Sequence, residues 1–305
     1  MAMEFNPNDV QEIDQNSVEQ SGPQYPSIQW HYGDAKAKKI GGMDYCGGWF
    51  VKSDQIEEET ATAAGWTKTT WTHDTGSEEE GFWRREIEVS VIAARRRWEV
   101  VSDFARQYFA WNKYDDAKLA GKASGRLHLL CLVKGMEDVG PFVLTLKGMS
   151  ALAVEGNRQN SGVLTKFAQT VITAANKASE AAVKKNGGQP ARWPYRAFWL
   201  TIGADRDGKD EPVFTEVGKD KATSRVVLPK PMNLPAKAEQ VNLADYYIGK
   251  ALLTTVNDLW AVAETNWTHA WDSIAPTAEV AAEAAVVAAN STAAANEDLI
   301  AEYGL

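Results

Sequence analysis

The sequence predicts an α+β, mainly β fold: an OB-like Greek-key barrel with an inserted helix, followed by C-terminal helices. Three observations lead to this prediction. Polar and apolar residues alternate over 86–92, which is typical of a half-buried strand. Two more strand-like runs, 126–134 and 142–147, precede a stretch of helical periodicity at 163–185. Further strands are expected after Pro190. The resulting order, which is three strands, then a helix, then two strands, is that of the OB barrel.

Ahead of these strands lie a polar segment and a glycine-rich one. Residues 1–24 are rich in Asn, Gln and Glu. We expect a disordered acidic arm there, because little apolar area is available to offset the entropy of ordering. Residues 40–51 place two Gly-Gly steps beside aromatic residues, which predicts a bent strand or hairpin with close backbone approach at the glycines. The Lys-Ser pair that follows at 52–53 lacks the preceding glycine of a Walker loop and no helix is expected to open there, so the segment does not fit a phosphate-binding loop.

The first barrel strand is expected to continue from 86–92 into 95–101 after a bulge or bend. Residues 104–126 are basic and aromatic and are interpreted as the long loop between the first two barrel strands. OB folds use that loop to bind oligonucleotides. Residues 135–139 fit a hairpin connection between the second and third strands.

The helix at 163–185 should end at the Asn-Gly-Gly step that follows it. The strands after it are expected at 195–202, 212–217 and 224–228. The acidic turn at 205–210 has some likeness to a calcium loop. It lacks the later ligands, however, and is interpreted as a hairpin turn.

A last helix is expected at about 243–262, with Leu252, Val256 and Leu259 on its packed face. The whole chain therefore divides into four expected segments. They are a disordered acidic arm at 1–24, an OB-like β-rich core at 25–235, a helical extension packed on that core at 236–275, and an Ala-rich acidic helix or tail at 276–305.

Charge is distributed unevenly along the chain. Residues 1–80 hold 15 acidic against 5 basic side chains, and residues 241–305 hold 9 against one. Residues 81–240 hold 26 Lys and Arg against 17 Asp and Glu, so the acidic total of −9 conceals a basic middle. Basic side chains beside aromatic rings are what a single nucleic-acid strand needs for its phosphates and unstacked bases.

Signatures of catalysis and metal binding are scarce. The two cysteines and four histidines are not in metal-ligand spacing, and no GxSxG or Walker motif occurs. Asp115 and Asp116 resemble half of a magnesium site, but a nuclease needs further carboxylates. We therefore expect no enzyme, no catalytic residue, no metal and no cofactor. The N-terminus lacks the features of a secretory signal, and we expect a cytoplasmic protein without membrane contact.

The predicted binding groove lies over residues 95–126. Its expected phosphate contacts are Arg95, Arg96, Arg97, Arg106, Lys113, Lys122 and Arg126, and its expected stacking faces are Trp98, Tyr108, Trp111 and Tyr114. Successive strand residues point to opposite faces, so the three consecutive arginines cannot all line one groove, and Trp98 is also a possible core residue.

Four short segments carry a family resemblance: 25–30, 41–50, 95–98 and 144–149. In them the chain resembles an uncharacterised family of proteins from phages, prophages and plasmids of bacteria, over roughly residues 25–230. The family has no established chemistry, so no catalytic residues transfer. Its mobile-element setting implies replication, recombination or virion assembly, in the host cytoplasm if the chain is phage-encoded.

Two functions of different classes follow. The first is sequence-nonspecific binding of single-stranded DNA, with RNA as an alternative ligand, other copies of the chain as partners, and replication or recombination proteins recruited by the acidic C-terminus. The second is a self-assembling structural protein of a filament, shell or tail, because oppositely charged ends and middle allow copies to dock head to tail.

Overall fold

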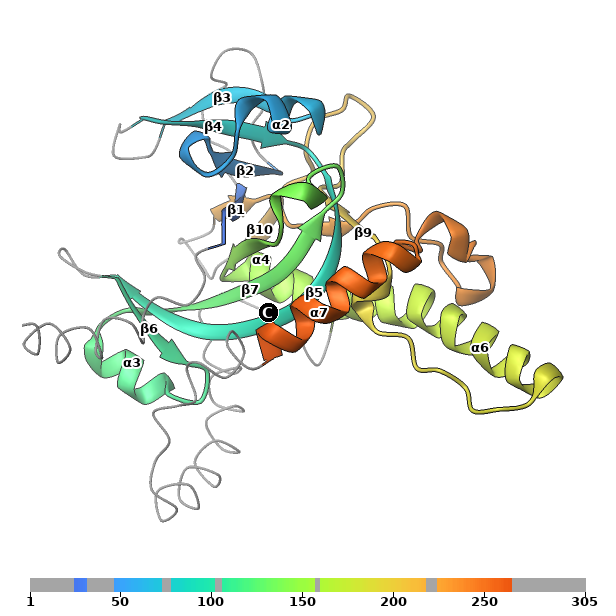
Figure 1. The fold of residues 1–305 in the computed structure, drawn as a ribbon. Coiled ribbons are helices and arrows are strands. Elements are labelled where there is room, and N and C mark those ends of the chain that lie inside the picture. Colours follow the sequence, from blue (N-terminus) through green and yellow to red (C-terminus); the bar gives the residue numbers. More distant parts are fainter. Residues whose placement is uncertain are drawn as a thin grey trace, which may run out of the picture.

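A large mixed β-sheet forms the centre of the molecule (Figure 1). The computed structural model describes residues 25–31, 47–72, 78–101, 106–156, 160–217 and 224–264. The expected arm at 1–24 and tail at 276–305 lie outside the described residues.

Ten strands make up this sheet, in the order β12-β9-β5-β7-β8-β1-β2-β4-β3, with β6 also paired to β5. Neighbouring strands are antiparallel except β1 and β8, which are parallel. The strands are β1 Ser27–His31, β2 Gly48–Lys52, β3 Thr67–Thr72, β4 Glu78–Arg84, β5 Ile87–Val101, β6 Arg106–Ala110, β7 Ala123–Val133, β8 Phe142–Lys147, β9 Leu200–Gly203 and β12 Lys230–Pro231. A separate two-stranded sheet pairs β10 Thr215–Val217 with β11 Ser224–Val226.

The mixed α+β class is confirmed, but the expected closed barrel is wrong. Strands β12 and β3 stand at opposite ends of the order and do not pair with each other among the described strands. The predicted third strand, β8, pairs on its outer side with β1 rather than with the last predicted strand. The sequence order of the elements could not reveal this, because β1 comes from far upstream in the chain.

The helices are shorter and more numerous than expected. They are α2 Glu58–Ala63, α3 Tyr114–Ala120, α4 Met149–Glu155, α5 Val163–Phe167, α6 Thr173–Asn186 and α7 Lys250–Ala263. The predicted helix at 163–185 is confirmed, with a π-helical segment at Ala168–Ile172 between α5 and α6, and it ends at Gly187 with a positive φ of 77°. The predicted last helix is confirmed from Lys250 onward. Residues 195–197, expected in a strand, instead form a 3-10 turn, η4.

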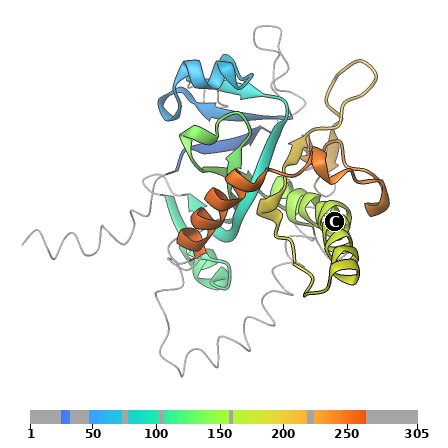
Figure 2. The same ribbon diagram turned by 45° about the vertical axis from the view of Figure 1, so that its right-hand side comes forward.

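Each face of the sheet has its own apolar cluster. On the first, which we call the core face, sheet residues such as Ile28, Leu129 and Leu144 pack with Val154 and Phe167 of the helices that follow β8. On the opposite face, α7 crosses β5 and β7 (Figure 2), and its residues pack against Ile92, Leu130 and Leu132. Helix α7 covers one end of this second face and leaves the polar residues of β5 and β7 beyond it.

A β-bulge in β5 decides which of its residues point to each face. Val91 pairs with Cys131 and Ala93 with Leu130, so one extra residue lies between the two pairs. Before the bulge, Ile87, Val89 and Val91 belong to the core face. Because the extra residue reverses the alternation, Arg95 and Arg97 point away from that face. The bulge or bend predicted between the two halves of this strand is confirmed.

Close approach is confirmed at the second of the two Gly-Gly steps, 47–48, whereas the first step, at 41–42, lies outside the described residues. A Cβ added at Gly48 would lie 2.5 Å from the indole of Trp83, and Gly47 has a positive φ of 70°. Gly81 on β4 is tighter still, because an added Cβ would lie 2.3 Å from the carbonyl oxygen of Val51. The aromatic side chains of this end of the sheet therefore pack directly on glycine backbone.

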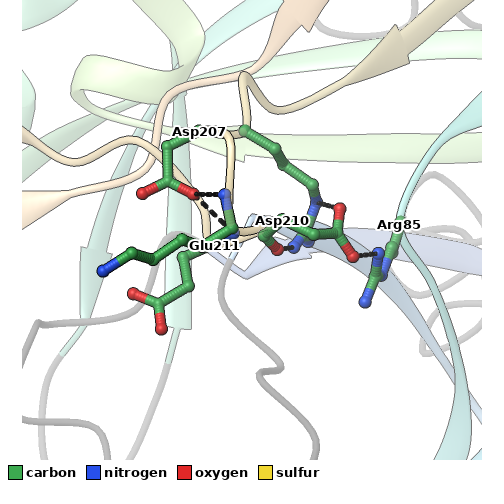
Figure 3. A network of polar contacts seen from close by, with 6 residues as sticks. Arg85, Asp207, Asp210 and Glu211 are labelled. Carbon is green, nitrogen blue, oxygen red and sulfur yellow. Dashed lines mark hydrogen bonds and ion pairs between the residues drawn. The ribbon is translucent and has the colours of Figure 1, made fainter.

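The acidic segment at 205–210 is a turn, as predicted (Figure 3). The Asp207 carboxylate accepts hydrogen bonds from the amides of Lys209 and Glu211, at 2.8 and 3.0 Å. Asp210 has a positive φ of 62° and forms an ion pair with Arg85 on the loop between β4 and β5. The carboxylates of this turn thus hold its backbone and fix it to the sheet.

We expect Gly81→Ala to lower the free energy of unfolding by about 1–3 kcal/mol, because the methyl group would overlap a strand carbonyl that cannot move independently. Urea unfolding measures this change. Gly208→Ala is the matched control, since no described atom lies within 4 Å of its added Cβ. Equal unfolding midpoints for the two variants would contradict the close packing at Gly81.

Candidate nucleic-acid interface

Register across four strands gathers charged and polar residues on the face opposite the core face. Paired residues on neighbouring strands share a face. Across β5 and β7, Arg95 lies opposite His128 and Arg97 opposite Arg126. On β8, Thr145 pairs with His128 and Lys147 with Arg126. On β6, Tyr108 pairs with Glu99. We call this set the arginine face; its members are Arg95, Arg97, Glu99, Tyr108, Arg126, His128, Thr145 and Lys147.

A chain of polar contacts crosses this face. The guanidinium carbon of Arg97 lies 3.5 Å from the centre of the Tyr108 ring, and its Nε donates to Nε2 of His128 at 3.0 Å. Because Nε2 accepts this bond, the proton of the neutral imidazole is on Nδ1. Nδ1 lies 3.5 Å from the hydroxyl of Thr145, which is 3.1 Å from that of Ser27 on β1. One guanidinium is thus held in place by a neutral histidine that the adjoining strands orient.

Burial, and then neighbouring arginines, lower the pKa values of two groups at the arginine face. His128 is 3% exposed, and its pKa is lowered well below 6.5 by burial and then by Arg97, Arg95 and Arg126. The pKa of Arg95 is lowered to about 9, again by burial first and by Arg97 second. Several cations therefore lie close together in a poorly solvated site, which is an environment that favours a bound anion.

Arg126 is already neutralised within the protein. Its Nε donates to Oε2 of Glu99 at 2.6 Å, and its terminal nitrogen contacts the same oxygen. Both side chains are largely buried, with 13% and 2% of their area exposed. The expectation that Arg126 binds phosphate is therefore corrected: its charge is balanced by a carboxylate that the sequence analysis did not include.

Trp98 and Arg96 lie on the other face of β5. Trp98 is 2% exposed and stacks on Trp111, with ring centres 4.2 Å apart and planes 8° apart. Its indole nitrogen donates to the carbonyl of Trp111 at 2.8 Å, and the centre of its ring lies 4.5 Å from that of Tyr114. The prediction that Trp98 offers a face to a base is wrong, because the protein occupies that face. Arg96 forms an ion pair with Glu155 and lies 5.2 Å from the Trp111 ring.

The segment 104–126 is not the long loop that we expected. It contains β6, which pairs with the end of β5, and α3, which packs on the buried Trp98 cluster. Arg106 begins β6 opposite Val101. Lys113 lies 3.7 Å from Asp116, and Lys122 is exposed just before β7. The structure therefore brings Arg95, Arg97 and Tyr108 together and separates them from the predicted residues on the core side.

Sequence reasoning missed four members of the arginine face: Glu99, His128, Thr145 and Lys147. Arg126 and His128 are two positions apart in a predicted strand, so alternation alone places them on one face. Their position relative to Arg95 and Arg97 needs the strand register, which the sequence does not supply.

Metal-ligand clusters and membrane-spanning helices are both absent from the described part of the chain. None of its His, Cys, Asp and Glu side chains gather in threes as a metal site requires. None of its helices combines the length and apolarity needed to cross a membrane.

Glu99→Gln is expected to lower the free energy of unfolding by about 3 kcal/mol, because the buried guanidinium of Arg126 would lose its counter-charge. Urea unfolding checks this. Glu239→Gln is the control, since the Lys177–Glu239 pair is largely solvated and its loss should leave the midpoint unchanged. A midpoint for Glu99→Gln equal to that of the wild type would show that the pair does not stabilise the fold.

His128 should also make stability depend on pH. Its folded pKa is depressed, so below about pH 6.5 the unfolded chain binds a proton that the folded chain does not. The free energy of unfolding then falls as the pH is lowered, by up to about 1.4 kcal/mol per pH unit. Urea unfolding of wild type and His128→Gln at pH 7.5 and at pH 5.5 isolates this effect. Between pH 7.5 and pH 5.5, the wild type should lose more free energy of unfolding than His128→Gln does. Equal losses in the two proteins would refute the depressed pKa of His128.

No protein-family model, curated protein or solved structure matches this chain. The resemblance to a family of phage- and plasmid-borne proteins therefore stays a prediction. The function has to be argued from the arginine face itself.

Proposed function

We propose that this protein binds single-stranded nucleic acid without sequence preference, with DNA as its first ligand, through the arginine face. The observation that carries the proposal is geometric: strand register places Arg95 and Arg97 on one face, with the guanidinium carbon of Arg97 3.5 Å from the centre of the Tyr108 ring. A phosphate chain is the polyanion that these cations attract, and the ring supplies the stacking surface that unpaired bases need.

The residues have distinct proposed roles. Arg95 and Arg97 contact phosphates, and Tyr108 stacks with a base or holds Arg97 in position for one. Lys147 is exposed on the neighbouring strand and extends the positive surface beyond β7. The stacked Trp98 and Trp111 support the sheet from the core side. None of these roles involves catalysis, and we propose no cofactor.

The setting that we propose is the cytoplasm of a bacterial host, with the protein encoded by a phage or plasmid. Residues 265–305 hold six acidic side chains and no Lys or Arg. In this proposal they recruit replication or recombination proteins, or compete with the strand for the arginine face. A chain shortened at residue 276 separates these alternatives, because only competition predicts tighter strand binding after the deletion.

A second candidate function is self-assembly as a structural protein. It is favoured by the charge layout of the chain, because acidic ends and a basic middle allow copies to dock head to tail. Sedimentation without nucleic acid distinguishes it from strand binding alone.

Fluorescence anisotropy with a labelled oligo-dT tests strand binding. Tyr108→Leu should weaken the affinity by about 1–3 kcal/mol, because one stacking surface is lost. Arg95→Gln and Arg97→Gln should each reduce the slope of log K against log salt by about 0.7, the value for one phosphate contact on a single strand.

Lys184→Gln is the matched control, because it removes an exposed charge from α6, away from the arginine face (Figure 1). Its affinity and salt dependence should equal those of the wild type. Failure of both the full chain and the chain ending at residue 276 to bind oligo-dT at low salt would reject the proposal.

A further inference from the structure

Two arginines of the arginine face, Arg97 and Arg126, lie directly opposite each other on β5 and β7. Like charges at facing positions repel each other. The structure gives the two side chains partners in opposite directions along the strands. Arg97 contacts His128, which belongs to the next pair toward the bulge. Arg126 contacts Glu99, which lies the other way along β5. These two contacts therefore draw the guanidinium groups apart.

The two partners differ in charge, and this decides what each arginine can do. Glu99 is a carboxylate, so it balances the charge of Arg126 within the fold. His128 is neutral, because burial and the neighbouring arginines keep its pKa well below 6.5. Its Nε2 accepts the Nε hydrogen of Arg97 at 3.0 Å, which fixes the position of that side chain without cancelling its charge. A cation held in this way still attracts a phosphate.

The contact depends on which imidazole nitrogen carries the hydrogen. A neutral histidine accepts only through the nitrogen that has none, so the hydrogen of His128 is on Nδ1. Nδ1 lies 3.5 Å from the hydroxyl of Thr145 on β8, and that hydroxyl lies 3.1 Å from the hydroxyl of Ser27 on β1. The bond that one ring nitrogen makes sets the state of the other. Thr145 thus favours the tautomer that can accept from Arg97.

We propose that His128 is a positioning residue for strand binding: it holds the charged Arg97 over the Tyr108 ring, in place for a phosphate. His128 is 3% exposed and does not itself touch the strand. Thr145 supports it by fixing the tautomer. Without the acceptor, Arg97 would have to be ordered when the strand binds, and the affinity would fall. This inference rests on the proposed function, since it concerns the same face.

Fluorescence anisotropy with oligo-dT compares two substitutions of His128. Leucine accepts no hydrogen bond, so His128→Leu should weaken the affinity by about 2–10-fold, the effect of ordering one long side chain on binding. Glutamine offers an oxygen to Arg97 and an amide hydrogen to Thr145, so His128→Gln should restore most of the affinity. Thr145→Val should also weaken binding, because it no longer favours the accepting tautomer. Thr67→Val, at an exposed position of β3, is the matched control and should bind as the wild type does.

A double-mutant cycle shows whether His128 acts through Arg97. In the Arg97→Gln background, His128→Leu should cause no further loss of affinity for oligo-dT, because no cation is left at that position to be held. An equal loss in both backgrounds would show that His128 acts on the fold or on another group, and would overturn the inference.

Nitrogen NMR of labelled protein without nucleic acid gives a measurement that does not depend on binding. The chemical shifts of the two ring nitrogens of His128 should show the hydrogen on Nδ1 in the wild type. Thr145→Val should show a share of the other tautomer. A wild type with the hydrogen on Nε2 would overturn the inference, because that nitrogen could not accept from Arg97.

The positioning role and the proposed function fail in different ways. Equal affinities of the wild type and His128→Leu for oligo-dT reject the positioning role and leave strand binding intact. If His128→Leu does not fold, an unchanged affinity of Thr145→Val rejects the role in its place. If neither the full chain nor the chain ending at residue 276 binds oligo-dT, the proposed function is rejected, and the positioning role with it.

Discussion

The ladder between β5 and β7 is the interaction on which the rest of the structure depends. Strand β5 is 15 residues long and pairs with β7 along most of its length, with β9 at one end and β6 at the other. Its single bulge reverses the alternation halfway along. Without that extra residue, Arg95 and Arg97 would share the core face with Val89 and Val91, which would bury two charges in an apolar layer. One inserted residue therefore separates the core from the arginine face.

The residues of this region divide between structure and function. Trp98 and Trp111 bury their flat faces against each other, and Arg126 is neutralised by Glu99. These groups stabilise the end of the sheet and are not available to a ligand. Arg95, Arg97 and Tyr108 lie on the polar side, where His128 accepts a hydrogen bond from Arg97 and contacts Tyr108 edge-to-face. For the proposed function, a guanidinium that is already held in position needs little reorganisation when a strand binds.

Much of the second half of the fold could be predicted from periodicity, because alternation and helical spacing are local properties. Strands β5, β7 and β8, the bulge, and helices α6 and α7 follow from them. That the sheet stays open and forms no barrel could not be predicted, because this depends on which strand edge β1 joins. Helix α3 was missed because its short sequence mixes charged and aromatic residues, as a loop does. At the site, residue types indicated cations and rings, but only strand register shows which of them share a face.

The parallel pairing of β1 with β8 has a consequence for the order of folding. It joins two antiparallel groups of strands, a first group of β1 to β4 and a second group of β5, β7 and β8, through the three pairs from Ser27 with Val143 to Gln29 with Thr145. During synthesis, β1 is made long before β8, so the first group has an unpaired edge until the second group is complete. Pairing between such distant segments is slow, and an open edge can pair with another chain. The pairing of the two groups is thus the step at which a nascent chain is most exposed to misassembly.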